Sequence, residues 1–204
     1  GSEPMNPDGT DGTPPGSPDL PADMDLQGLP EVRLRLEELD LEAGPFCASA
    51  GDPSEALIAS IRKVGLLTPP LVQRRRGGGW DVVTGFRRLR ALRALGRTAC
   101  WARDLTGISR TGLERLLLGL HDNLATRHLN DLEKGMALSR LSAHVDRETL
   151  LREYMPLLGL GRRDELLTVH LALTEAETPV RTAVAEGRLS LQAFQALRAW
   201  APPD

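Results

Sequence analysis

The 204-residue sequence has no long apolar run and only two cysteines. No segment approaches the roughly 18 consecutive apolar residues that a membrane-spanning helix requires, and the first residues lack the basic-then-apolar pattern of a signal peptide. Cys47 and Cys100 are far apart and belong to no CxxC or Cys/His spacing, which argues against a disulfide framework and a zinc site. We therefore expect a cytoplasmic globular protein that makes no membrane contact.

Basic residues are absent from positions 1–30, although this segment holds six Asp or Glu residues among many Gly, Pro and Ser. Such a composition buries too little apolar surface to fold, so we predict a disordered tail, with Gly1-Ser2 as an expression scar. The formal charge is −3 for the chain and −6 for the tail, which leaves +3 for the body. That mildly basic body is compatible with a nucleotide or nucleic acid partner but is far less basic than a dedicated DNA-binding domain.

The segment 31–108 alternates strand and helix patterns, which predicts an α+β domain around a small sheet. The period-2 pattern favours strands, and the helical spacing of apolar residues favours helices. We expect strands at 31–36, 71–73, 80–84 and 98–103, and helices at 54–64 and 86–95. Asp52 or Ser54 is the expected cap of the first helix, Gly65 its end, and residues 77–79 the turn of a hairpin.

The remainder of the chain has helical patterns only. We predict linking helices over 109–145, the first ending near 121–123 and the second capped by Asn130 with Glu133. An all-α domain over 146–200 follows, with helices near 147–158, 163–171, 179–186 and 191–200. The ending APPD is expected to be a linker cut short.

The stretch from Trp80 to Arg97 is the strongest candidate site. Its strand pattern changes to a helix pattern at Gly85, and the start of a helix presents free backbone N–H groups to an anion. The following arginines could grip phosphate oxygens; they are Arg87, Arg88, Arg90 and Arg93. The alternative, a solvated helix face, stays open for Gly-x-Arg-Arg alone.

Three segments, in one order, resemble the family of ParB N-terminal domains, the CTP-binding domains of partition proteins, which share their fold with sulfiredoxin. SIRKVGLLTPPLV (60–72) is similar to the first box of the family, with Thr68 in place of the usual Gln. GFRRLRA (85–91) resembles the second box, with Phe86 in place of Glu, and DNLATRHLNDLEKG (122–135) resembles the third. The resemblance implies an α+β ParB/sulfiredoxin-like domain followed by an all-α module with a degenerate helix-turn-helix.

The resemblance also implies a CTP site. The turn at Thr68-Pro69 would lie near the base, and Asp122 with Asn123 would hold Mg²⁺ against the triphosphate. The expected nucleotide-binding residues are Thr68, Pro69, Thr84, Gly85, Phe86, Arg87, Arg88, Asn123 and Arg127. Arg127 either replaces the charge of an arginine that the family has one position earlier or is simply solvated.

The helical module is a candidate for DNA contact. By the same resemblance, residues 154–160 would form a first helix and turn, and residues from Gly161 onward a recognition helix. The side chains that could touch DNA are Arg162, Arg163, Thr168 and His170. Asp164 and Glu165 repel phosphates there, so a bundle kept for packing or dimer closure is an equal alternative.

In function, the resemblance implies a CTP-dependent switch that closes as a homodimer around DNA, with a partition ATPase as a further partner. Two alternatives stay open for catalysis, weak CTP hydrolysis or binding without turnover. A DNA-binding adaptor without nucleotide dependence is the main competing function. A nuclease would need clustered carboxylates, which the sequence does not show, and sulfiredoxin chemistry needs a cysteine where Phe86 stands.

Overall fold

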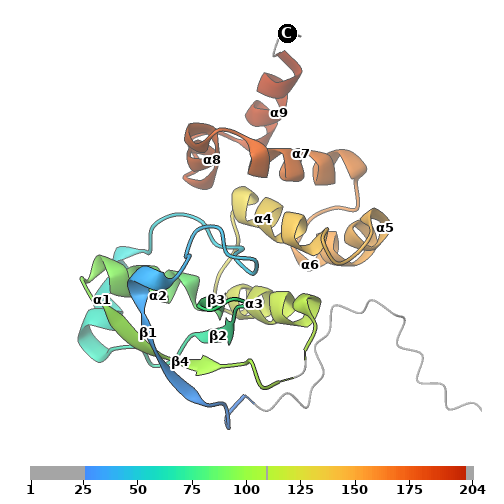
Figure 1. Ribbon diagram of the computed structural model, residues 1–204. Coiled ribbons are helices and arrows are strands. Elements are labelled where there is room, and N and C mark those ends of the chain that lie inside the picture. Colours follow the sequence, from blue (N-terminus) through green and yellow to red (C-terminus); the bar gives the residue numbers. More distant parts are fainter. Residues whose placement is uncertain (1–25, 109, 201–204) are drawn as a thin grey trace, which may run out of the picture.

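The computed structural model describes residues 26–108 and 110–200, and it confirms an α+β fold (Figure 1). The sheet has the strand order β1-β4-β2-β3. Its strands are β1 (Glu31–Arg35), β2 (Leu71–Arg74), β3 (Trp80–Thr84) and β4 (Ala99–Asp104). The β1/β4 and β2/β3 pairs are antiparallel, whereas β2 and β4 are parallel. Residues 1–25 of the predicted tail and the ending at 201–204 lie outside the described residues.

Local capping signals set the first two helices, α1 (Glu55–Val64) and α2 (Phe86–Ala94). Of the two caps that the sequence allowed, the hydroxyl of Ser54 is used, and it accepts the N–H of Leu57 at 3.3 Å. Gly65 follows α1 with a φ of 76°, the left-handed region that glycine tolerates. A short 3-10 helix, η1 (Leu36–Glu38), follows β1.

Helix α3 (Gly112–Thr126) crosses from the sheet to the helical part of the molecule. Its predicted end near 121–123 was wrong, because the helix continues for one more turn, in which the hydroxyl of Thr126 donates to the carbonyl oxygen of Asp122 at 3.1 Å. Asp122 and Asn123 therefore lie on a helix and not in a loop. Gly119 lets α3 touch the sheet, since a Cβ there would lie 2.5 Å from the carbonyl oxygen of Val83.

The helical part begins with α4 (Asp131–Leu141), where Asn130 and Glu133 form the predicted capping box. One continuous helical stretch follows, made of α5 (Arg147–Thr149), the π-helical η2 (Leu150–Tyr154) and α6 (Met155–Leu157). The last helices are α7 (Asp164–Glu175), α8 (Thr178–Ala185) and α9 (Leu191–Trp200). No helix in the described part of the chain is long and apolar enough to cross a membrane.

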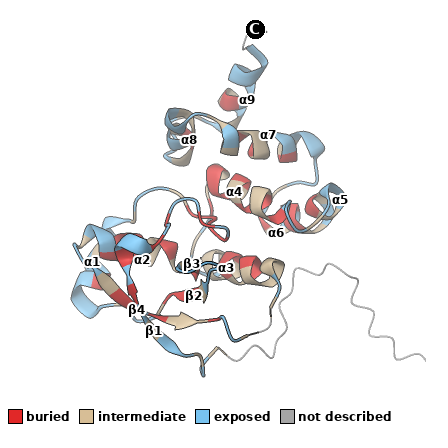
Figure 2. Cartoon of the chain, in the orientation of Figure 1, coloured by how far each residue is buried: buried red, intermediate tan, exposed pale blue. Residues whose placement is uncertain are grey.

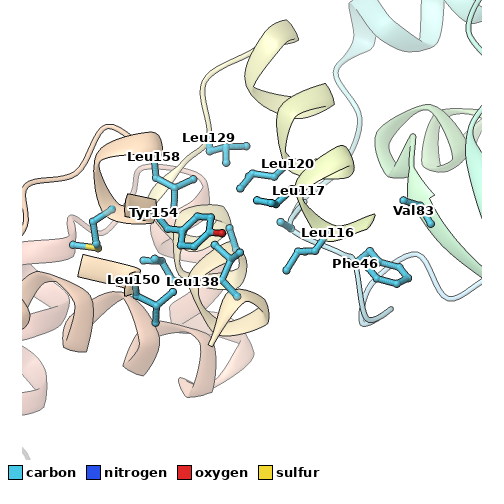
Figure 3. Packing of buried hydrophobic residues seen from close by; sticks show 14 of the residues in the cluster. Phe46, Val83, Leu116, Leu117, Leu120, Leu129, Leu138, Leu150, Tyr154 and Leu158 are labelled. Atoms are coloured by element: carbon cyan, nitrogen blue, oxygen red, sulfur yellow. The ribbon is translucent and has the colours of Figure 1, made fainter. Parts of the chain in front are cut away.

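The largest apolar core runs through α3. Figure 3 shows Leu116, Leu117 and Leu120 between Val83 and Phe46 on the sheet side and Tyr154 on the helical side. The faces of α3 and α4 that meet in this core are buried, while the outer surfaces of α1 and α9 are largely exposed (Figure 2). The position of α3 relative to both halves is thus fixed by burial of apolar surface.

Candidate functional site

A pocket of about 450 Å³ lies where the three family-like segments meet. Its volume falls within the range of roughly 300–1,000 Å³ that is usual for small-molecule sites. It is lined by Ser54, Leu57, Thr68, Gly85, Phe86, Arg87, Arg88, Asp122, Asn123, Thr126 and Arg127. The structure therefore brings together eight of the predicted nucleotide and metal residues, which come from α1–β2, α2 and α3.

The first turn of α2 forms one wall of this pocket. Gly85 has a φ of 95°, and a Cβ there would lie 2.9 Å from the Cβ of Pro70, so only glycine fits without strain. No side chain caps α2, and its first turn holds no acidic residue. The open helix start is consequently suited to an anion, since its N–H groups and dipole are not neutralised locally.

Arg88 links all three segments. Its Nη1 donates to the carbonyl oxygen of Thr68 at 2.7 Å, and its Nη2 lies 3.2 Å from Oδ2 of Asp122. These contacts join the loop before β2 to the end of α3 through the first turn of α2. Arg88 thus positions the pocket walls, and only part of its hydrogen-bonding capacity is left for a ligand.

Arg87 differs from its neighbour because, within 26–108 and 110–200, its guanidinium has no hydrogen bond or ion pair, and its buried Nε is unsatisfied. Burial, and then the positive charge of Arg127, lower the pKa of Arg87. Although the charge of Glu133 acts in the opposite direction, a half-buried cation without an ion pair is unfavourable in the empty protein, and an anionic ligand would relieve that cost. Arg87 is therefore a cation of the pocket wall that has no ion pair within the described part of the chain.

Arg127 lines the pocket and its side chain is only 17% exposed, so the solvated alternative does not hold, whereas its role as a replacement for the family arginine stays a prediction. Its terminal nitrogens bind the buried carboxylate of Glu133 at 2.6 and 2.9 Å. Glu133 also accepts the N–H groups of Ala50 at 3.0 Å and Asn130 at 3.1 Å. The sequence indicated Glu133 as a capping residue and a member of the third box, and the structure adds that it is the centre of a buried network that holds Arg127.

Asp122 and Asn123 provide the only carboxylate and the only side-chain amide of the pocket lining. Mg²⁺ in nucleotide sites is usually held by one or two carboxylates together with phosphates and water, so these two oxygen donors fit such an ion. Among the described residues, no group of three or more His, Cys, Asp or Glu side chains could hold a metal ion. The pair would therefore hold Mg²⁺ only together with the phosphates of a ligand.

A second pocket of about 300 Å³ adjoins the first and shares Thr68, Arg88 and Asp122 with it. Pro69 and Thr84, the two remaining predicted residues, line this pocket together with Leu26, Leu67, Leu71, Arg103 and Leu118. The hydroxyl of Thr84 accepts the N–H of Leu71 at 3.3 Å, so this side chain supports the hairpin. The greater apolar content of this lining suits the base or sugar of a nucleotide.

Phe86 occupies a core position at the pocket edge. Its side chain is only 4% exposed and belongs to the apolar cluster of the sheet. The ring lies 3.8 Å from a Cβ built on Gly44, so it also packs against the loop after η1. At the position where the family resemblance leads us to expect a glutamate, this chain has an aromatic ring that packs in the core.

Two of the four arginines that could have gripped phosphate oxygens, Arg90 and Arg93, have structural roles instead. Arg90 is 6% exposed and donates to the carbonyl oxygen of Ser49 at 2.8 Å. Arg93 donates to the carbonyl oxygens of Leu36 and Leu39 at 2.8 and 3.1 Å. Both side chains donate to backbone carbonyl groups of the 36–51 segment and neither lines the pocket.

The candidate DNA-contact residues are only partly on the surface. Arg162, Arg163 and Thr168 are exposed, and the hydroxyl of Thr168 accepts a hydrogen bond from Arg147 at 2.7 Å. His170 is fully buried and its Nδ1 lies 2.7 Å from the carbonyl oxygen of Leu166, so its assignment to a DNA-facing surface was wrong.

Arg147 was not predicted as a functional residue from the sequence. Its Nε and Nη2 lie 2.7 and 2.9 Å from the two carboxylate oxygens of Asp164. This ion pair neutralises one of the two carboxylates that were expected to repel DNA at the start of α7.

Comparison with known proteins identifies the domain that supplies the pocket walls from α1 to α2. Residues 44–105 match the family model of the ParB N-terminal domain. The chain contains a ParB N-terminal domain. This match includes the first two boxes and ends before Asp122, so the third box rests on the sequence resemblance and on its place in the pocket.

The chain is also similar to partition proteins. The chain is 32% identical to the chromosome-partitioning protein ParB of Myxococcus xanthus, over 69% of this chain and 45% of that protein. It is 36% identical to a probable plasmid-partitioning protein ParB of Thermus thermophilus, over 66% of this chain and 42% of that protein. The chain spans less than half the length of these two relatives.

A solved structure of a C-terminally truncated chromosome-partitioning ParB from Caulobacter crescentus, complexed with CTP-gamma-S, is also similar. It is 22% identical, covers 84% of this chain and 93% of that chain, and has a TM-score of 0.40.

Proposed function

We propose that this ParB-domain chain binds CTP with Mg²⁺ in the 450 Å³ pocket and acts as a nucleotide-dependent switch on DNA. The observation that carries the proposal is the convergence of the three boxes on one pocket, with the unpaired guanidinium of Arg87 at its wall. The triphosphate lies at the start of α2, where backbone N–H groups and Arg87 neutralise its charge. The base and sugar extend toward the adjoining, more apolar pocket.

Mg²⁺, when bound, neutralises charge on the phosphate oxygens and orients them. Asp122 and Asn123 are the residues that would hold the ion. For Asp122 this requires partial release of Arg88, because the two side chains are 3.2 Å apart in an ion pair. Ligand binding would thus loosen the link between α2 and α3, which gives the switch a physical basis.

The pocket offers little for the hydrolysis of CTP. The pocket lining contains no histidine or glutamate, and its carboxylate, Asp122, is assigned to the metal. Turnover would then rest on positioning and charge neutralisation alone, which supports slow hydrolysis at most.

The test is calorimetric titration with CTP and Mg²⁺, in parallel with ATP, GTP and UTP. We expect cytidine-selective binding that weakens about 10- to 100-fold in Arg87→Ala, the loss of one charged hydrogen bond. Arg62→Ala removes an exposed arginine of α1 outside the pocket lining and should leave binding unchanged. An absence of cytidine-selective heat in the wild-type protein would rule the proposal out.

One observation favours the adaptor without nucleotide dependence. Arg88 with Asp122, and Arg127 with Glu133, already satisfy each other in the protein without ligand. A nucleotide gains less binding free energy in a pocket whose charges are already paired than in one with free charges. Retention on DNA that is equal with and without CTP, and unaffected by Arg87→Ala, would support this second function.

The remaining partners belong to the same proposal. DNA, a second copy of the chain and a partition ATPase are expected from the resemblance, as is a cytoplasmic location near the nucleoid. Helices α5 to α7, two helical stretches joined by a short turn, are the proposed helix-turn-helix. Arg162 and Arg163 at the start of α7 are its proposed DNA contacts.

A further inference from the structure

The hairpin between β2 and β3 ends in a strongly basic tip that the nucleotide site does not use. Its sequence is RRRGGGW, residues 74–80. The N–H of Arg75 donates to the carbonyl oxygen of Gly79 at 3.0 Å, which closes the loop. Gly77, Gly78 and Gly79 all have positive φ values, of 91°, 102° and 83°. The tight turn therefore projects three arginines from a narrow ribbon, with only glycines between them and Trp80.

Two of the three charges at this tip are not neutralised. Arg75 pairs with Asp81 at 3.0 Å. Arg74 lies over the Trp80 ring, 4.7 Å from its centroid, and Arg76 is exposed, with no ion pair in the described part of the chain. A guanidinium stacked on an indole keeps its edge free for hydrogen bonds, so Trp80 orients Arg74 while the N–H donors of Arg74 remain available.

The tip is separated from the nucleotide pocket by the length of β3. Trp80 begins this strand and Thr84 ends it beside Gly85. Four residue steps of about 3.3 Å place the two ends about 13 Å apart. The tip can therefore be changed without touching the pocket walls.

We infer that the β2–β3 hairpin tip binds the phosphate backbone of duplex DNA, independently of sequence, through Arg74 and Arg76. This inference rests on the proposed association with DNA and does not depend on CTP binding. Arginine matches phosphate geometry with a planar fork, and a two-stranded ribbon is narrow enough to enter a DNA groove. The three glycines let the backbone approach the phosphates closely.

Duplex DNA fits this tip better than an acidic protein segment does. Apart from Trp80, the tip presents no apolar side chain that a protein partner could cover, and a protein interface normally needs an apolar centre. Phosphate contacts need only charge and hydrogen-bond donors, which is what the tip offers.

The experiment measures binding of a labelled random-sequence duplex as a function of salt. The test variant is Arg74→Ala/Arg76→Ala in the full chain. The matched control, Arg62→Ala/Arg97→Ala, removes two exposed arginines outside the tip and the pocket lining. We expect the slope of log K against log salt to fall by about 1.8 in the test variant, about 0.9 per lost phosphate contact.

This difference in slope means that the ratio of the DNA-binding constants, wild-type protein over test variant, falls about tenfold between roughly 50 and 200 mM salt. Arg74→Lys/Arg76→Lys should restore most of the slope, because it restores charge. Calorimetry should show unchanged CTP binding in every tip variant.

Each outcome is decisive. Equal slopes for the test variant and the wild-type protein would overturn the inference and leave the proposed switch untouched. Wild-type protein that binds no duplex would overturn both the inference and the proposed DNA association. A labelled polyglutamate peptide held more tightly than the duplex, through the same arginines, would reassign the tip to an acidic protein and also overturn the inference.

Discussion

At the residue scale, Phe86 shows how one substitution in a family motif changes the role of a position. The family carboxylate would lie in the phosphate box, but this ring is 4% exposed and packs in the core of the sheet. The protein has therefore gained apolar burial where relatives are expected to carry charge.

We predict that Phe86→Glu lowers stability instead of restoring a better nucleotide site. The new carboxylate would be buried without a partner and the ring contacts would be lost, which should cost about 3–5 kcal/mol. Urea unfolding followed by circular dichroism measures this change. Phe86→Leu, which keeps an apolar group, should cost clearly less, and a Glu variant as stable as the wild-type protein would show that the position is not a core position.

At the element scale, α3 determines how the third box meets the other two. Gly119 allows the contact, since a Cβ there would lie 2.5 Å from the carbonyl oxygen of Val83. One turn further along α3, Asp122 reaches Arg88 of α2. The spacing of these residues on α3 thus links packing on the sheet to the geometry of the pocket.

We expect Gly119→Ala to push α3 away from β3. The clash involves backbone on the β3 side, which cannot move aside cheaply, so the cost should be about 1–3 kcal/mol, with weaker CTP binding as a second effect. Thermal unfolding and calorimetry measure the two effects. Gly107→Ala adds the same methyl group where no atom lies within 4 Å and should change neither quantity.

The turn between α3 and α4 is held by Arg127 and Glu133. Glu133 is 1% exposed and binds Arg127 as well as two backbone N–H groups. Removing only Arg127 leaves a buried carboxylate with too few donors, so Arg127→Met should cost about 3–5 kcal/mol. In a double-mutant cycle, we expect Glu133→Gln to lower the free energy of unfolding much less in the Arg127→Met background than in the wild-type background. Strictly additive costs would contradict a coupled pair.

The sequence predicted these elements better than it predicted their partners. Ser54, Gly65 and Gly85 act on their immediate neighbours, so the starts and ends of α1 and the start of α2 could be placed from local signals. Arg88 and Asp122 are 34 positions apart, and Arg90 and Ser49 are 41 positions apart. Such contacts depend on how helices pack on the sheet, which no local pattern encodes.

The family motifs compensated for part of this limit in the candidate site. Because the three boxes were treated as one constellation, the residues of the pocket wall could be grouped before their geometry was known. No motif in the sequence indicated that His170 would be buried or that Arg147 would pair with Asp164. His170 is buried where α7 packs closely on α4, since a Cβ on Gly135 would lie 2.4 Å from the carbonyl oxygen of His170, and the ion pair joins α5 to α7.

At the scale of the whole molecule, the main apolar core crosses the predicted domain boundaries at 108 and 145. It joins Leu71 and Val83 of the sheet to Leu116 of α3 and to Tyr154 and Leu167 of the helical part. The sheet and the last helices also have smaller apolar clusters of their own, around Phe86 and around Leu173, but the largest cluster spans both parts. A shared core predicts that the sheet and the helices lose structure together.

We therefore expect one cooperative unfolding transition in urea. In a Trp200→Phe background, fluorescence reports on Trp80 and Trp101 of the sheet, whereas circular dichroism reports mainly on the helices. The two midpoints should coincide. Leu116→Ala, which removes a fully buried side chain between the halves, should shift both midpoints equally and cost about 2–5 kcal/mol. Separate midpoints, or a shift confined to one probe, would mean that the halves fold independently and that α3 belongs to only one of them.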